Sequence, residues 1–150
     1  MQLTPFPPAK ISRRRPKDFA IRAFSCSFAG MAKYLFLEYP KCSTCRKARA
    51  FLETNGVDFE ARHIVENPPT ADELRAWIAR AGVPARKCFN TSGLRYKALA
   101  LKEKLPAMSE EEQIALLASD GMLVKRPVLV SADAARFGFR NWETLPEAAR

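Results

Sequence analysis

Residues 33–65 read KYLFLEYPKCSTCRKARAFLETNGVDFEARHIV, and this stretch decides the fold. Residues 33–39 are rich in aromatic and aliphatic side chains, as expected of a buried strand that the following proline ends. Helical periodicity runs over residues 43–55, and Gly56 supplies the stop. Residues 57–65 alternate between apolar and polar side chains, as a second strand does. The stretch therefore predicts a βαβ unit.

The remainder of the chain predicts helices followed by a pair of strands. A Thr–Glu capping box opens a helix over residues 70–82, and a Ser–Glu box opens another helix at Ser109. Residues 83–99 are less regular and are expected to form a helix–loop–helix segment. Residues 122–139 predict two strands joined by a short turn, and Trp142 begins a last helical turn. The predicted order of elements is β-α-β-α…α-β-β.

That order, with a Cys-x-x-Cys motif directly after the first strand, is typical of a thioredoxin-like domain. We therefore predict an α/β protein with a thioredoxin-like fold. In this fold, a helical insertion separates an N-terminal βαβ part from a C-terminal ββα part. The folded domain is expected to span residues 31–150.

Residues 1–30 differ in composition from the rest of the chain. They hold six Lys or Arg and one Asp, a net charge of +5, whereas the remaining 120 residues carry +4 of the chain's +9. Arginine-rich leaders occur in export and transit signals, but the short apolar part that follows here is interrupted by Arg22. We interpret residues 1–30 as a disordered basic leader. A start codon assigned upstream of the true one, at Met31, is the alternative interpretation.

Composition and cysteine usage restrict the class of protein. Hydrophobic residues make up 47% of the 150 residues and charged ones 27%, the balance of an ordinary soluble globular protein. No run approaches the ~20 apolar residues of a membrane span, and the charge outside the leader is no strong nucleic-acid signature. One close cysteine pair and two scattered cysteines favour a reducing compartment. We therefore expect a cytoplasmic protein that acts as a monomer, away from membranes.

The two cysteines of the motif, Cys42 and Cys45, are expected at the first turn of the predicted helix. Free N–H groups at a helix N-terminus, together with Lys41, Arg46 and Lys47, favour a thiolate on Cys42. The two-residue spacer permits a disulfide, so Cys45 can resolve a mixed disulfide or a sulfenate on Cys42. Redox or nucleophilic thiol chemistry is therefore the favoured interpretation.

Two other roles for the pair stay open. A structural zinc site needs about four ligands, and because Cys88 and His63 are isolated in the sequence we expect no metal. Alternatively, the two cysteines could simply be small residues that pack a helix start. Cys88 itself is expected to be buried and inert, and His63 to be a packed or surface histidine.

Several phrases of the sequence occur in the same order in a known family. The phrases YPKCSTCRKARAFLETNGV, ENPPTADEL, FNTSGLRYKAL and LVKRPVLV together resemble the glutaredoxin-linked arsenate reductases and their Spx-type relatives, over roughly residues 33–142. The chain is most similar to an uncharacterised arsenate reductase-like branch with the same cysteine motif. The resemblance implies a thiol-dependent oxidoreductase, and so an enzyme.

The resemblance also implies roles for individual residues. Cys42 matches the family's nucleophile, which attacks the arsenic of arsenate, and Arg126 matches an arginine that binds the oxyanion and stabilises the thiolate. Pro127 matches a proline whose preceding peptide bond is cis, and Arg46 matches an arginine on the helix near the cysteine. Electrons would come from glutathione, glutaredoxin or thioredoxin, with no cofactor bound.

The sequence departs from the arsenate reductases at three points. Two further arginines of that family fall near Asn90 and within residues 137–139, and the family has no cysteine where Cys45 stands. A single arginine makes fewer charge-assisted bonds to an oxyanion, each worth about 1.5–3 kcal/mol. We therefore expect another oxidised or disulfide substrate in preference to arsenate, with Cys45 as the resolving thiol.

The NTSG phrase is a candidate substrate-binding loop. Asn90, Thr91 and Ser92 offer amide, hydroxyl and backbone N–H donors to an oxyanion or to glutathione. A simple turn closed by Gly93 is the alternative interpretation.

The second functional hypothesis is a redox-sensing regulator. Spx-type proteins also carry Cys-x-x-Cys, and disulfide formation there switches their contact with RNA polymerase. The resemblance therefore implies RNA polymerase as an alternative partner, beside a small oxyanion or disulfide substrate and a redox protein donor. The phrase RKCFNTSG differs from that of the regulators, and we therefore favour the enzyme.

Overall fold

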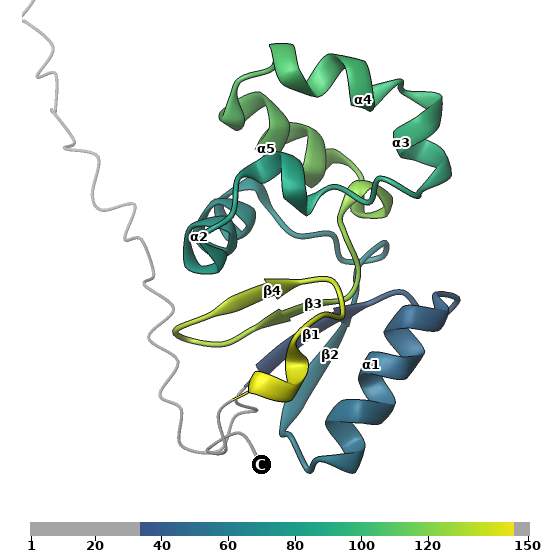
Figure 1. Ribbon diagram of the computed structural model, residues 1–150, viewed down its shortest axis with the longest axis vertical. Coiled ribbons are helices and arrows are strands. Elements are labelled where there is room, and N and C mark those ends of the chain that lie inside the picture. Colours follow the sequence, from purple (N-terminus) through teal and green to yellow (C-terminus); the bar gives the residue numbers. More distant parts are fainter. Residues whose placement is uncertain (1–33, 146–150) are drawn as a thin grey trace, which may run out of the picture.

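The computed structural model describes residues 34–145, which are built around a four-stranded sheet (Figure 1). The strands lie in the order β2-β1-β3-β4, and their bounds are β1 (Tyr34–Glu38), β2 (Phe59–His63), β3 (Val128–Val130) and β4 (Ala135–Phe137). β1 pairs in parallel with β2 and antiparallel with β3, while β3 and β4 form an antiparallel hairpin. The predicted thioredoxin-like fold with a helical insertion is confirmed.

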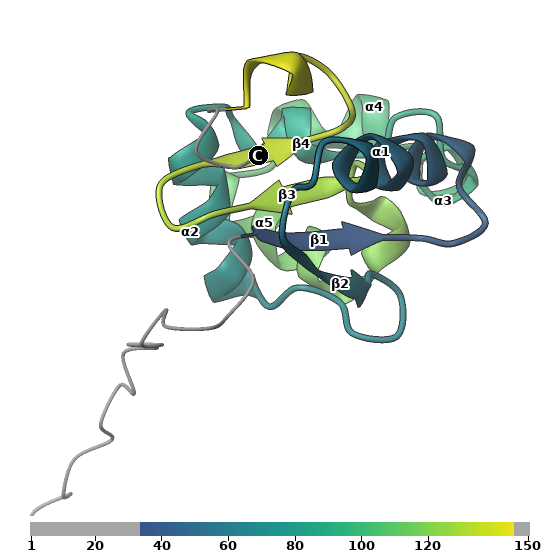
Figure 2. The ribbon, with the colours of Figure 1, turned by 90° about the horizontal axis from the view of Figure 1, so that it is seen from below.

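Successive strand residues point to opposite faces of the sheet and so build two cores. Phe36 and Leu129 pack with Leu52 of helix α1 (Ser43–Thr54). The next residue of β1, Leu37, packs instead in the cluster under the insertion. Figure 1 shows α1 on one side of the sheet with α2 and α5 on the other, and Figure 2 looks onto the side of α1.

The insertion consists of short helices between β2 and β3. Its helices are α2 (Ala71–Ala81), α3 (Leu94–Ala98), α4 (Leu101–Lys104) and α5 (Glu110–Ser119), with 3-10 turns η1 (Ala85–Cys88), η2 (Leu105–Ala107) and η3 (Gly121–Leu123). A last 3-10 turn, η4 (Trp142–Thr144), follows β4 at the predicted position. Both predicted capping boxes are present, at Thr70 and at Ser109, so α2 and α5 begin where the sequence places them.

The strands are shorter than the sequence suggests. Of residues 57–65 only β2 is strand, and Ala61 within it is exposed because β2 lies at an edge of the sheet. Of residues 122–139, the first part forms the end of η3 and a connecting segment, and β3 starts only after Pro127. The leader of residues 1–30, the domain start at Met31 and the last five residues lie outside the described residues.

The sheet brings two distant segments together. Leu37 near the end of β1 pairs with Val128 at the start of β3, in antiparallel register. The residues that follow β1, including Cys42, therefore lie beside those that precede β3, including Arg126. Within residues 34–145, every helix is too short or too polar to cross a bilayer.

Candidate active site

Cys42 lies where the chain turns from β1 into α1. The N–H of Cys42 donates to the carbonyl of Tyr39 at 2.9 Å, which closes the turn. Cys42 is the N-cap residue of α1 and has an extended backbone, so its side chain stands beside the free N–H groups of the first helical turn. Cys42 is partly exposed, whereas Cys45, one turn further, has no exposed surface.

Opposing influences act on the pKa of the Cys42 thiol. Partial burial disfavours the thiolate, but the N–H of Cys45, the thiol of Cys45, the N–H of Thr44 and the Arg126 guanidinium all stabilise it. Together these groups hold the pKa of Cys42 below its ordinary value. Cys42 therefore has the properties of a nucleophilic cysteine.

The pKa of the Cys45 thiol is shifted in the opposite direction. Burial raises its pKa to about 12, and its hydrogen bond to Cys42 acts in the same direction. The N–H of Tyr39 donates to the Cys45 Sγ at 3.5 Å and only partly offsets this rise. Ionisation is therefore favoured at the partly exposed Cys42 and disfavoured at the buried Cys45, whose thiol donates to the Cys42 sulfur.

Arg126 supplies the cation next to the pair. The Arg126–Pro127 peptide bond is cis, as predicted, and the guanidinium carbon lies 5.0 Å from the centre of the Tyr39 ring. Nη1 of Arg126 donates to the Met122 sulfur at 2.9 Å. Among the described residues, Nε of Arg126 is a buried side-chain nitrogen without a hydrogen-bond partner. A buried donor of this kind costs about 1–3 kcal/mol until an acceptor reaches it.

A short ladder of backbone hydrogen bonds fixes the opposite wall of the site. The N–H of Asn90 donates to the carbonyl of Leu123 at 2.7 Å, and the N–H of Lys125 donates to the carbonyl of Cys88 at 2.7 Å. These bonds hold the NTSG loop against the segment that ends in Arg126. The loop and the arginine are therefore positioned by the same contacts.

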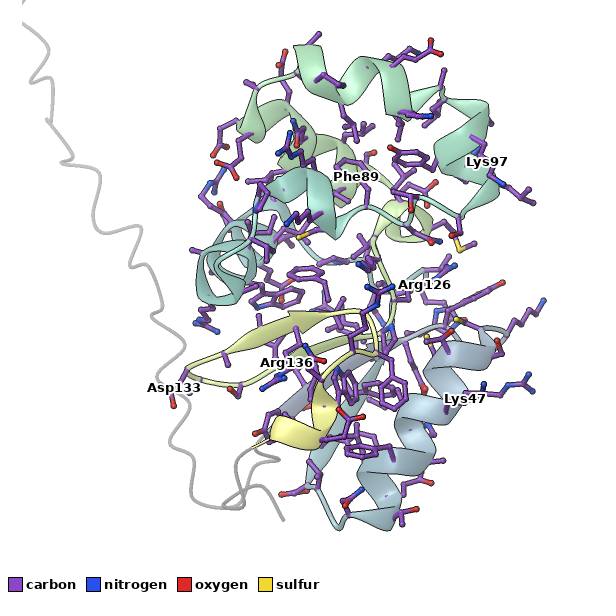
Figure 3. The ribbon with its side chains drawn as sticks, in the orientation of Figure 1. Lys47, Phe89, Lys97, Arg126, Asp133 and Arg136 are labelled. Atoms are coloured by element: carbon purple, nitrogen blue, oxygen red, sulfur yellow. The ribbon has the colours of Figure 1, made fainter. Side chains whose placement is uncertain are left out.

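A cavity of about 460 Å³ opens between these walls, a volume typical of small-molecule sites. Its lining consists of Cys42, Thr44, Asn90, Ser92, Gly93, Leu94, Arg95, Met122 and Arg126. Figure 3 shows the Arg126 side chain between the sheet and the insertion, so the cavity lies where the two parts meet.

The structure brings together only some of the predicted site residues. Asn90 and Ser92 line the cavity with Cys42, whereas Thr91 lines a different cavity. Arg46 is exposed on α1 and is absent from the cavity lining, and Pro127 is buried. Arg46 and Thr91 are therefore not placed against the Cys42 sulfur.

Four lining residues were not predicted from the sequence: Thr44, Leu94, Arg95 and Met122. Arg95, on α3, borders the cavity and pairs with Asp120 through Nε at 2.9 Å, and Met122 accepts from Arg126. Asp120 also accepts the N–H of Met122 at 2.8 Å, so one carboxylate holds both segments. The only sequence signal for Arg95 was its place just after NTSG, and nothing in the sequence joined it to Asp120.

The other two candidates behave as expected. Cys88 has no exposed surface, and burial raises its pKa to about 12 despite the nearby Lys125. The His63 ring packs edge-on against Tyr39, with centroids 5.8 Å apart, and its Nδ1 accepts from the N–H of Glu66 at 3.1 Å. Within residues 34–145, no three His, Cys, Asp or Glu side chains are grouped closely enough to bind a metal.

The comparisons with known proteins agree with this architecture. Residues 37–145 match the ArsC family, and the chain belongs to that family. It is 50% identical over 106 residues to the uncharacterised protein YusI of Bacillus subtilis, covering 71% of this chain and 90% of YusI.

Two solved structures share the fold at similar identity. One is an ArsC family related protein from Bacteroides fragilis, with a TM-score of 0.72 and 53% identity over 74% of this chain and 93% of that one. The other is a possible arsenate reductase from Streptococcus mutans, with a TM-score of 0.70 and 48% identity over 75% and 96%. The family and these neighbours support a thiol oxidoreductase-like function.

Transcriptional regulators are also among the relatives. The chain is 28% identical over 112 residues to the global transcriptional regulator Spx 2 of Bacillus anthracis, covering 73% of this chain and 84% of the regulator. This chain is therefore similar both to a possible arsenate reductase and to a transcriptional regulator.

Proposed function

We propose that this protein is a thiol–disulfide oxidoreductase in which Cys42 is the nucleophile and Cys45 resolves the intermediate. The observation that carries the proposal is the contrast between the two thiols. The pKa of Cys42 is lowered at the N-terminus of α1, while that of Cys45 is raised to about 12 as its thiol donates to the Cys42 sulfur. This contrast suits Cys42 to attack the substrate first, while Cys45 stays protonated until the mixed disulfide has formed.

The reaction would proceed by two exchanges. The Cys42 thiolate attacks one sulfur of a substrate disulfide, a mixed disulfide forms, and the other half leaves as a thiolate. Cys45 then loses its proton to the medium and attacks the Cys42 sulfur, which releases the second thiolate and leaves a Cys42–Cys45 disulfide. The substrate gains two electrons and the pair loses two. Glutathione, glutaredoxin or thioredoxin would reduce the pair again.

The charge around the cavity favours an anionic substrate. Arg126 has a buried Nε that finds no acceptor among residues 34–145, and Arg95 borders the same cavity. Asn90 and Ser92 add amide and hydroxyl groups beside them. Glutathione disulfide and glutathione mixed disulfides have both a disulfide bond for Cys42 to attack and carboxylates for the arginines to bind. Arsenate is the weaker candidate, because the two further arginines of the arsenate reductases are absent at Asn90 and within residues 137–139.

The proposal is tested by turnover of the purified protein. Hydroxyethyl disulfide, glutathione disulfide and arsenate are offered in parallel, each with glutathione and glutaredoxin or with thioredoxin and its reductase. Cys42→Ser is expected to abolish turnover. Cys45→Ser, incubated with the disulfide substrate in the absence of any reductant, is expected to accumulate a mixed disulfide on Cys42, visible in the intact mass.

Cys88→Ala is the matched control, because this buried cysteine lies outside the pair and outside the cavity lining. It should retain turnover within about twofold of the parent. Equal turnover in Cys42→Ser and the parent, or no turnover with any substrate and donor, would overturn the proposal.

The second candidate is a redox-sensing regulator, favoured by the Cys-x-x-Cys pair together with the likeness to Spx 2. It predicts that RNA polymerase is captured by one redox state of the pair and not by the other. Capture that depends on oxidation and is lost in Cys42→Ser, in a protein without turnover, would favour the regulator over the enzyme.

A further inference from the structure

A second cavity of about 400 Å³ lies in the insertion, apart from Cys42. Four basic side chains border it: Arg86, Lys87, Lys102 and Lys125. No Asp or Glu of residues 34–145 belongs to its lining. The four cations come from η1, from α4 and from the segment before β3, so the tertiary structure, not a run of sequence, collects them.

These cations lack the partners that other basic residues have. Arg62, Arg75 and Arg95 each form an ion pair with a carboxylate. By contrast, no carboxylate in the described part of the chain lies within ion-pair distance of any of the four. Glu110, whose charge acts on nearby Cys88, accepts the N–H of Ala85 at 3.4 Å and lines another cavity. The charge of the basic cavity is therefore left for an external anion.

Apart from Thr91, the remaining walls of the basic cavity are aromatic or aliphatic. Phe89 and Tyr96 meet edge to face, with ring centroids 6.2 Å apart, and Leu105 and Pro106 complete the surface. Figure 3 shows Phe89 inside the insertion, between its helices. A ligand that filled the cavity would need a flat or apolar body as well as a negative group. A bare inorganic anion would leave these walls without contacts.

We propose that this basic cavity binds a small organic phosphate with an aromatic body, of the size of an aryl or nucleoside monophosphate. The phosphate would lie among the four cations, which suit it as charged donors, and the ring would lie against Tyr96. The volume is within the range of about 300–1,000 Å³ that small-molecule sites occupy. This site is independent of the thiol chemistry proposed for Cys42.

The test is a titration of the full-length, isotope-labelled protein by NMR. The probes are phenyl phosphate, adenosine monophosphate, adenosine and inorganic phosphate. Saturable shifts at Thr91 and Lys102 are expected with the two organic phosphates. Inorganic phosphate and adenosine should each bind at least tenfold more weakly, because inorganic phosphate lacks the aromatic body and adenosine lacks the phosphate.

Charge-reversal variants locate the site. Lys87→Glu combined with Lys102→Glu is expected to weaken phenyl phosphate binding at least tenfold. The matched control is Lys97→Glu combined with Lys104→Glu, which makes the same charge change at exposed lysines outside the cavity lining. Figure 3 shows Lys97 pointing away from Phe89. The control should change binding by less than twofold, and melting curves verify that both variants are folded.

Tyr96→Ala tests the contact with the aromatic body of the ligand separately from the contact with its phosphate. It should weaken phenyl phosphate at least threefold and leave inorganic phosphate unchanged. The proposal would be overturned by equal losses in both charge-reversal variants, by shifts confined to the cavity of Cys42, or by phenyl phosphate binding no tighter than inorganic phosphate. Binding of acidic peptides without any binding of phenyl phosphate would also overturn it and indicate a protein partner.

Discussion

The guanidinium of Arg126 lies over the ring of Tyr39, with its central carbon 5.0 Å from the ring centre. The backbone N–H of the same tyrosine donates to the Cys45 sulfur, and its carbonyl accepts from the N–H of Cys42. Tyr39 thus joins the cation to both cysteines. A substitution of this ring should therefore change the reactivity of the Cys42 thiolate.

Replacing the ring tests this relationship. A cation–π contact at a partly exposed site is worth about 0.5–1 kcal/mol. Tyr39→Leu should therefore lower the rate of Cys42 alkylation by iodoacetamide near pH 7 about twofold to fivefold, because Arg126 is held less firmly beside the thiolate. Tyr39→Phe keeps the ring and should retain the parent rate. A parent-like rate in Tyr39→Leu would contradict the role assigned to the ring.

The pH dependence of alkylation should differ among the cysteines. Only the thiolate reacts, and the pKa of Cys42 lies below its ordinary value. Cys42 should therefore stay reactive as the pH is lowered below about 8.5, the value of an unperturbed cysteine. Cys45 and Cys88, whose pKa values are raised to about 12, should remain unlabelled there. Peptide mass spectrometry reads each cysteine separately, and equal profiles for Cys42 and Cys45 would refute the assignment.

The buried thiol of Cys88 should make the fold sensitive to alkali. Its pKa in the folded state, about 12, exceeds that of an unfolded cysteine, so the folded state holds the proton more tightly. This contribution to stability is complete below about pH 8.5 and is lost as the pH rises toward 12. Between pH 8.5 and pH 10 the loss from one such group is about 1–2 kcal/mol.

Chemical denaturation at the two pH values measures that loss. Cys88→Ala removes the group, so its free energy of unfolding should fall less between pH 8.5 and pH 10 than that of the parent. Any packing loss from the substitution is common to both pH values and cancels in the difference. An identical fall in parent and variant would show that Cys88 does not carry the effect.

Arg95 and Asp120 should act on substrate binding. Arg95 borders the Cys42 cavity and is held by Asp120 at 2.9 Å. Arg95→Gln should raise the KM for an anionic disulfide about tenfold, since a charge-assisted hydrogen bond is worth about 1.5–3 kcal/mol. The kcat should change little.

Asp120→Asn serves as the companion variant. It removes the charge that holds Arg95 but keeps an oxygen to accept the N–H of Met122. It should free Arg95 for the substrate and lower the KM for an anionic disulfide, while leaving that for a neutral disulfide unchanged. An unchanged KM in both variants would exclude Arg95 from the binding site.

Gly121 marks a close approach of two backbone segments. A Cβ built there would lie 1.9 Å from the carbonyl oxygen of Ile64, which is backbone and cannot swing aside. Gly121→Ala should therefore destabilise the protein by about 3 kcal/mol or more. Gly82→Ala is the comparison, since Gly82 has a left-handed backbone at φ 62° with open space around it. There the cost should be about 1 kcal/mol. Urea denaturation measures both.

The elements that the sequence predicted well are those with local signals. The capping boxes at Thr70 and Ser109, the stop at Gly56 and the strand before Pro40 all depend on neighbouring residues, and all occur as predicted. The short strands of the C-terminal hairpin were less predictable. Their lengths depend on the pairing of β3 with β1 and of β4 with β3, which no local pattern records.

In the candidate site, too, the residues predicted from the sequence are those with a local signal. Cys42 at the start of α1 followed from the spacing of the motif and from the helix that succeeds it. Arg95 and Met122 escaped notice because they reach Cys42 through the packing of the insertion. Thr91, adjacent to two residues of the Cys42 cavity, lines the basic cavity instead, because the chain turns at residues 90–93, where the N–H of Gly93 donates to the carbonyl of Asn90 at 3.0 Å.

By itself, the sequence predicted the fold class, which the structure confirms, and indicated thiol chemistry at Cys42 as the proposed activity. A cysteine pair at a helix N-terminus is a property of a few contiguous residues, and its effect on a thiolate comes from the backbone of that helix. Only the tertiary structure decided which charges meet that thiolate and which are left over. The antiparallel pairing of β1 with β3 brings Arg126 to Cys42, and the folding of the insertion gathers the four cations of the basic cavity. Charges act through distance in space, and that distance is set only when the chain has folded.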